Sequence, residues 1–139
     1  MPDYDRAKHL EMISKAIERM DKASFSLKAL SPAALGVALI LIDKHVPAWL
    51  ALGAAALAVC IYWWLDAAYL GRERSFRKLF DKVRLGELDK DPYVMDIAKI
   101  FGPRGGTLTC MRASATFCVH GPALLLIGAA FISLSLVGR

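Results

Sequence analysis

The stretch Val46–Leu70, VPAWLALGAAALAVCIYWWLDAAYL, carries Asp66 as its only formal charge and runs straight into GRERSFRK at residues 71–78. At about 1.5 Å per residue, a helix of this length can cross a hydrocarbon core roughly 30 Å thick. The segment predicts a membrane-spanning helix whose basic end marks the cytoplasmic face. An ionisable side chain at membrane depth is costly unless it is paired, so Asp66 is the first candidate for a functional residue.

Composition and charge predict a small integral membrane protein. The chain has 139 residues, 56% of them hydrophobic, which favours one membrane domain over 1–139. Residues 71–112 hold ten Lys/Arg against six Asp/Glu, whereas residues 1–28 hold six against five. This basic middle segment suits anionic lipid headgroups, and it lacks the interleaved aromatic residues that would favour nucleic acid. The first 22 residues are polar and show no cleavable signal peptide.

The remaining segments complete an all-α membrane fold. Residues 4–22 place apolar side chains at helical spacing, which predicts an amphipathic helix that packs against protein. We expect transmembrane helices over 24–42, 46–70 and 113–137, the second continuing as a cytoplasmic helix to 84. A short amphipathic helix is expected over 93–101. Pro32 either begins the first span or kinks a helix that began earlier. Because the N-terminal and 71–112 segments are basic, the N-terminus should be cytoplasmic and the C-terminus periplasmic.

A polar stripe follows one face of the second span. Tyr62, Asp66, Tyr69 and Glu73 recur at helical spacing, so this face should meet protein or water. They could line a cation-conducting vestibule. Alternatively, Asp66 accepts hydrogen bonds from tyrosine hydroxyls or pairs with an arginine of a neighbouring helix or subunit.

A histidine in the third span is expected at nearly the depth of Asp66. If the two spans are neighbours, His120 and Asp66 differ by about 5 Å in depth. Such a pair could shuttle protons or sense pH. Alternatively, His120 donates to a backbone carbonyl that Pro122 leaves without its usual partner.

Two further sets of residues point to surfaces. Basic side chains near the expected cytoplasmic face either contact headgroups or bind a phosphorylated ligand, such as a nucleotide signal, through arginine forks; these are Arg72, Arg74, Arg77, Lys78, Arg84 and Arg112. Small or helix-interrupting residues favour close helix packing; these are Gly53, Ala54, Ala56 and Pro122.

Cofactor and metal chemistry has little support in the sequence. Cys60, Cys110 and Cys118 lack metal-ligand spacing, and their number and placement argue against a disulfide framework. No motif for a nucleophilic serine or a phosphate-binding loop is present. The sequence therefore predicts no metal, no cofactor and no enzymatic activity. A lipid-modifying enzyme using His120 with Asp66 is the least favoured alternative.

The stretch 62–81, YWWLDAAYLGRERSFRKLFD, resembles a motif of small uncharacterised bacterial inner-membrane proteins. In that family it reads approximately W-x-L-D-x-x-Y-L-x-x-E-R-x-F-R. The resemblance covers about a third of the chain. The layout of the chain is also similar to that of SLATT-type membrane effectors of bacterial antiphage systems, although the third span departs from their usual two-span form. The similarity implies oligomers that permeabilise the membrane, and it assigns no residue.

Two functional hypotheses follow. Three helices offer little interior in which to satisfy Asp66, so we expect a homo-oligomer that forms or gates a pore in the bacterial cytoplasmic membrane. The alternative is a membrane-anchoring or accessory subunit that holds a partner through the 4–22 helix and residues 76–101.

Overall fold

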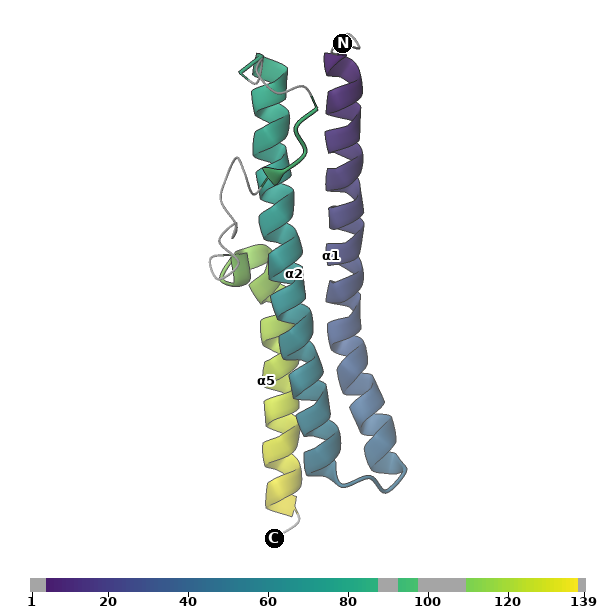
Figure 1. Cartoon of the computed structure of the whole chain (residues 1–139). Coiled ribbons are helices and arrows are strands. Elements are labelled where there is room, and N and C mark those ends of the chain that lie inside the picture. The colour runs from purple at the N-terminus through teal and green to yellow at the C-terminus, as the bar shows by residue number, and fades with distance from the viewer. Residues whose placement is uncertain (1–4, 88–92, 98–109, 138–139) are drawn as a thin grey trace.

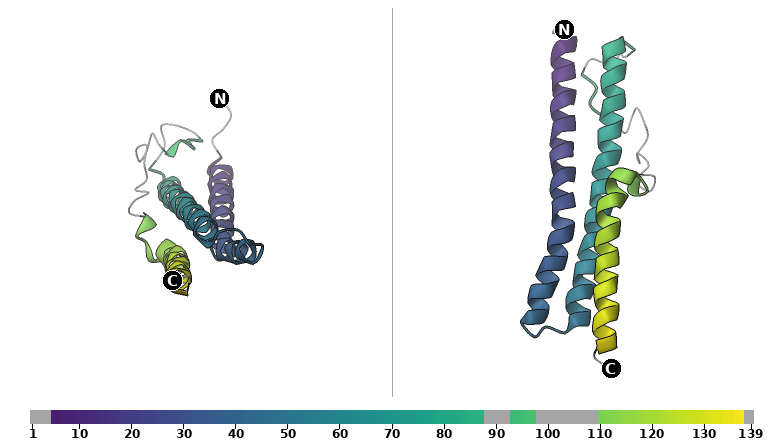
Figure 2. Two further views of the ribbon diagram at one scale, coloured as in Figure 1. Left: turned by 90° about the horizontal axis from the view of Figure 1, so that it is seen from below. Right: turned by 180° about the vertical axis from the view of Figure 1, so that it is seen from behind.

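A computed structural model describes residues 5–87, 93–97 and 110–137. Its long elements are the helices α1 (Arg6–Asp43), α2 (Ala48–Leu85) and α5 (Ser114–Val137). Helices α1 and α2 form an antiparallel hairpin, and α5 packs beside the half of α2 nearest the hairpin turn (Figure 1). Seen along the long axis, α2 lies between α1 and α5 (Figure 2). Each of these helices is long and apolar enough to cross a membrane.

Helix α1 is one continuous helix, whereas the sequence predicts separate segments over 4–22 and 24–42. It begins beside Asp5, whose carboxylate accepts hydrogen bonds from the amides of Ala7 and Lys8. No proline or glycine interrupts residues 6–31. Pro32 lies inside this helix, so it does not begin the first span, and the helix that contains it began earlier. A proline inside a helix costs energy because it removes one backbone hydrogen bond. The contacts of α1 with α2 offset that cost here.

Helix α2 begins and ends at residues that suit those positions. Pro47 precedes it, and the Pro47 carbonyl accepts from the amides of Leu50 and Ala51. Gly86 follows it with φ of 76°, a left-handed conformation that ends the helix and that glycine adopts without strain. The expected second span and its continuation to 84 are thus one helix of 38 residues.

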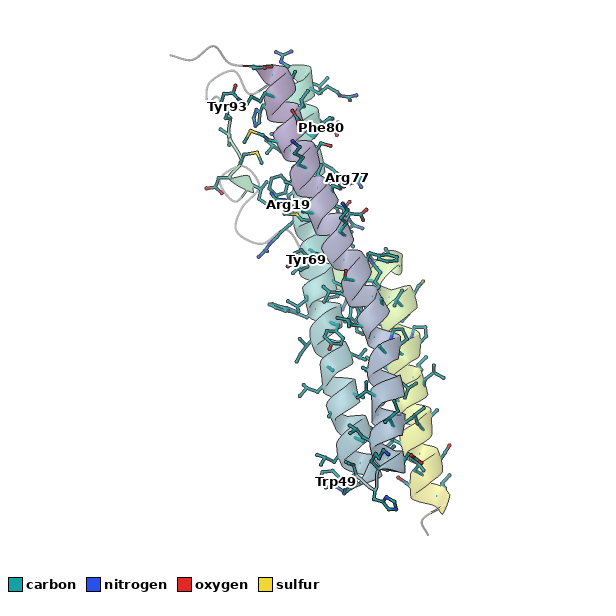
Figure 3. The ribbon with its side chains drawn as sticks, turned by 90° about the vertical axis from the view of Figure 1, so that its right-hand side faces the viewer. Arg19, Trp49, Tyr69, Arg77, Phe80 and Tyr93 are labelled. Carbon is teal, nitrogen blue, oxygen red and sulfur yellow. The ribbon has the colours of Figure 1, made fainter. Side chains whose placement is uncertain are left out.

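The hairpin is longer than a membrane is thick. A helix of 38 residues measures about 57 Å, nearly twice the hydrocarbon thickness of roughly 30 Å. Two hydrophobic clusters hold the molecule together. The one near the hairpin turn joins all three helices and is made of small and branched residues: Ala38, Ala51, Leu52, Ala55, Val59, Ala123 and Ile127. Trp49 lies at this end, and Phe80 and Tyr93 lie at the other (Figure 3).

The second cluster lies in the part of the hairpin that extends beyond α5, which we call the stalk (residues 6–22 of α1 and 70–85 of α2). Its centre is Ile13, Ala16, Phe76, Leu79 and Val83. Charged side chains of the stalk such as Glu11 and Lys15 face outward, whereas Glu73 is buried. The first half of α1 therefore packs against protein along one narrow stripe, with α2 as its partner.

Residues 93–97, which we call the strap, run along the stalk. Tyr93 has φ of 63°, so the helix expected over 93–101 does not begin there, and residues 98–101 lie outside the described residues. The side chains of Met95 and Ile97 pack on the stalk cluster. The Val94 carbonyl oxygen accepts a hydrogen bond from Nε2 of His9, which ties the strap to the stalk.

Candidate functional site

A buried polar network joins the three helices within the apolar half of the molecule. Its centre is the carboxylate of Asp66 on α2, which is fully buried. The Oδ1 atom accepts a hydrogen bond from the Ser24 hydroxyl. It also forms an ion pair with Lys28, whose Nζ lies 3.3 Å away. The same Nζ donates to the Ser24 Oγ at 2.6 Å. Both partners come from α1, so these bonds fix α1 against α2.

The third helix enters the network through His120. Its Nε2 lies 3.1 Å from Oδ2 of Asp66, and its Nδ1 lies 2.6 Å from Oγ of Ser31 on α1. A neutral ring with its proton on Nε2 satisfies both contacts, because Nδ1 then accepts from the Ser31 hydroxyl. The indole of Trp63 stacks on the ring, with centroids 6.2 Å apart. His120 is therefore held from three sides and has no exposed surface.

The spacing of residues along α1 explains how this one helix contacts both Asp66 and His120. Ser24, Lys28 and Ser31 recur at intervals of four and three, which places them on one face of the helix. Asp66 is 18 residues from Ala48 at the start of α2, or about 27 Å along the axis. The network thus lies about one hydrocarbon thickness from the hairpin turn.

The network is fully satisfied. Among the described residues, every buried side-chain nitrogen and oxygen has a hydrogen-bond partner. Removing one partner from such a buried cluster leaves a charge without compensation, which costs about 3–5 kcal/mol. The arrangement can do two things chemically: it holds the helices in one register, and it presents a proton-binding imidazole to a carboxylate.

The predicted polar stripe of α2 faces the other helices of its own chain. Asp66 and Glu73 are buried, and Tyr62 and Tyr69 are half-buried. Glu73 accepts from Arg77 at 2.7 Å along the same helix. The described residues that bind Asp66 are a serine, a lysine and a histidine, and the tyrosine hydroxyls and the arginine of a neighbouring helix in the alternative interpretation are not among them. The contact between Asp66 and His120 is the one considered from the sequence, and such a pair is suited to proton transfer or pH sensing.

The predicted basic surface is exposed along its length. Arg72, Arg74, Arg77, Lys78, Arg84 and Arg112 all face outward. Arg77 contacts Glu73, Arg84 contacts Asp81, and Arg74 contacts the thiol of Cys110 at 3.8 Å. Of the predicted packing residues, Gly53, Ala54 and Pro122 are exposed and Ala56 is half-buried.

Sequence reasoning did not identify Ser24 and Lys28 as partners of Asp66, or Ser31 as the partner of His120. The signal was their common face on a helix, opposite a lone acid on the next one. Within the described residues, no three side chains of His, Cys, Asp or Glu gather closely enough to hold a metal ion. Comparison of the chain with protein-family models, curated proteins and solved structures finds no match.

Proposed function

We propose that this chain is a non-enzymatic membrane protein that assembles with copies of itself and forms or gates a pore in the bacterial cytoplasmic membrane. In this proposal the stalk and the N-terminus are cytoplasmic, and the C-terminus is periplasmic. The observation that carries the proposal is the Asp66–His120 pair, at 3.1 Å and fully buried among membrane-length helices. Ionisable groups inside membrane spans are expensive and usually serve ion or proton movement.

Assembly is part of the proposal because the three helices of one chain pack directly on one another and leave the pore to be formed between copies. The cluster of Leu52, Val59 and Ile127 and its neighbours fills the space between them. A water-filled path would therefore run between copies, with the buried pair setting the packing of each copy. A groove of about 270 Å³ between α1 and α2 supports close contact between copies, because small residues such as Ala54 and Ala58 line it.

The basic side chains support the proposed orientation and a lipid partner. Arg72, Arg74 and Arg112 are exposed near the end of the α5 span, where cationic groups on the cytoplasmic side meet anionic headgroups. The layout similar to that of antiphage effectors makes antiviral defence the first process to test. A cytoplasmic nucleotide signal bound by the arginines is the corresponding trigger to try.

Flux through liposomes tests the pore directly. Purified protein is reconstituted in vesicles containing phosphatidylglycerol, and the release of potassium and of a small dye is measured. We expect flux above protein-free vesicles, and we expect Asp66→Asn to change its rate or ion preference. Ser133→Ala, on the exposed side of α5, is the matched control. If wild-type vesicles leak no faster than empty ones at every pH and with every nucleotide tried, the proposal is wrong.

The mass of the detergent-extracted protein tests assembly separately. We expect a closed ring of several copies. Ala54→Leu adds bulk to the groove and should dissociate the ring. Gly128→Leu is the control, since a carbon added at Gly128 meets no atom within 4 Å. A wild-type monomer in lipid-preserving detergent would contradict the assembly.

A second candidate, the anchoring of a cytoplasmic partner, is favoured by the stalk. It extends beyond α5 and carries a groove lined by Met12, Lys15, Glu18, Arg19, Lys22 and Met95. An anchor needs such a projecting surface and needs no pore. Affinity purification from native membranes separates the two functions, because a stoichiometric foreign protein without self-assembly would favour anchoring.

A further inference from the structure

We propose that Lys28 and His120 are alternative counter-ions of Asp66, so that His120 takes up a proton when Lys28 leaves. The two cations reach the carboxylate from different helices. Lys28 bonds to Oδ1 and His120 to Oδ2. The inference deepens the proposed function and rests on it for a role in gating, whereas the proton uptake itself is measured without flux.

Charge balance in a buried site carries the first step. Asp66 and His120 have no exposed side-chain surface, so a net charge beside them is poorly solvated. With Lys28 in place, one negative and one positive group cancel, and a proton added to His120 would leave an excess positive charge. With Lys28 absent, the carboxylate is uncompensated, and a proton from water restores neutrality.

The exposure of Lys28 makes the exchange physically accessible. Its side chain keeps 25% of its surface exposed, in contrast to the enclosed pair. A lysine with a long flexible stem can turn its ammonium group toward the membrane surface while its methylenes stay in the apolar region. Lys28 can therefore leave the network without unfolding α1, whereas His120 is held by Trp63 and Ser31.

The chemistry of the ring decides where the proton goes. A free imidazole binds a proton at a higher pH than a free carboxylic acid, about 6.5 against about 3.9. Nε2 already points at Oδ2, and Nδ1 would gain the proton and donate a hydrogen bond to the hydroxyl oxygen of Ser31. On the face of α2 that carries Asp66, the other titratable side chains are Tyr62, Tyr69 and Glu73. The Glu73 carboxylate accepts a hydrogen bond from Arg77.

Nitrogen NMR of the full chain in lipid nanodiscs, labelled at histidine, tests the exchange. The chain has three histidines, and His120→Gln assigns the signal. In wild-type protein at pH 7 we expect a neutral ring with the proton on Nε2. In Lys28→Met we expect the doubly protonated ring, a gain of about one proton per chain. Adding Asp66→Asn to Lys28→Met should return the ring to the neutral form.

Two further variants keep the test decisive. Lys28→Gln can retain the hydrogen bond to Ser24 and should give the same protonated ring if Lys28→Met does not fold. Lys22→Met, on the exposed surface of the same helix, should leave the ring neutral. A neutral ring in both Lys28 variants, or a protonated ring in wild-type protein, overturns the inference. Failure of the liposome flux would refute the pore and leave this result standing.

Discussion

Lys28 and His120 bind the two oxygens of one carboxylate, Lys28 at Oδ1 of Asp66 and His120 at Oδ2. They belong to helices α1 and α5, which the sequence separates by the whole of α2. The Asp66 side chain therefore links all three helices at one depth. The strength of that link, and of the packing around it, can be measured residue by residue.

Loss of the Ser31 hydroxyl should weaken the fold. Ser31→Ala leaves Nδ1 of His120 without its partner at 2.6 Å in a site that excludes water. We expect the free energy of unfolding to fall by about 1–3 kcal/mol. Unfolding in mixed micelles, followed by circular dichroism, gives the value. Ser133→Ala, at an exposed position, should change it little, and equal losses in the two variants would contradict the described network.

Two leucines on nearly opposite sides of one turn of α2 should respond very differently to truncation. Leu52 is 1% exposed in the cluster that joins the three helices, whereas Leu50 is 49% exposed. Leu52→Ala should lower the free energy of unfolding by about 2–5 kcal/mol through the cavity that it leaves. Leu50→Ala should have a much smaller effect. The reverse order would mean that α2 presents a different face to its neighbours.

The strap should loosen when its anchor on α1 is removed. His9 is buried, its Nε2 lies 3.0 Å from the Val94 carbonyl oxygen, and its ring lies against that of Tyr93. In His9→Ala we expect amide hydrogens of the strap to exchange about five- to tenfold faster, as the loss of about one hydrogen bond implies. Mass spectrometry of peptides covering 93–97 measures the rate. Lys8→Ala is the exposed control, and unchanged exchange in His9→Ala would refute the anchoring role.

In the exposed pair Glu18–Lys22, the carboxyl group should have a pKa below its usual value and the ammonium group a pKa above its usual value. The hydrogen bond from Lys22 is the main cause that lowers the pKa of Glu18 below 4.5, and the same bond raises the pKa of Lys22 above 10.5. The contribution of Glu18 is thus present above pH 4.5 and lost as the pH falls through its lowered pKa. That of Lys22 is present below pH 10.5 and lost as the pH rises through its raised pKa.

Carbon NMR of the Glu18 carboxyl group checks this prediction. Its midpoint should move back toward 4.5 in Lys22→Met. Lys15→Met, which affects the separate Glu11–Lys15 pair, should leave the midpoint of Glu18 in place. Because both groups are exposed, the change in stability itself should be small.

Much of the architecture could be predicted without coordinates. The apolar length of the segments set the number of membrane-length helices, because hydrocarbon thickness and helical rise leave little choice. The glycine at position 86 is a sequence signal of the kind that ends helices, and in the structure it follows α2 with a left-handed backbone. The boundary predicted near residue 23 was wrong, because nothing in the local sequence ends a helix there and α2 supports α1 along its whole length.

The sequence by itself determined that Asp66 is buried and needs a partner, since an unpaired charge in the hydrocarbon core has a high free-energy cost. Only the tertiary structure decided which partner it has. Ser24, Lys28 and His120 lie 38 to 54 positions away along the chain, and the register of α1 and α5 against α2 brings them together. That register depends on the fit of Leu52, Val59 and Ile127 in the shared core, and helical periodicity does not specify it.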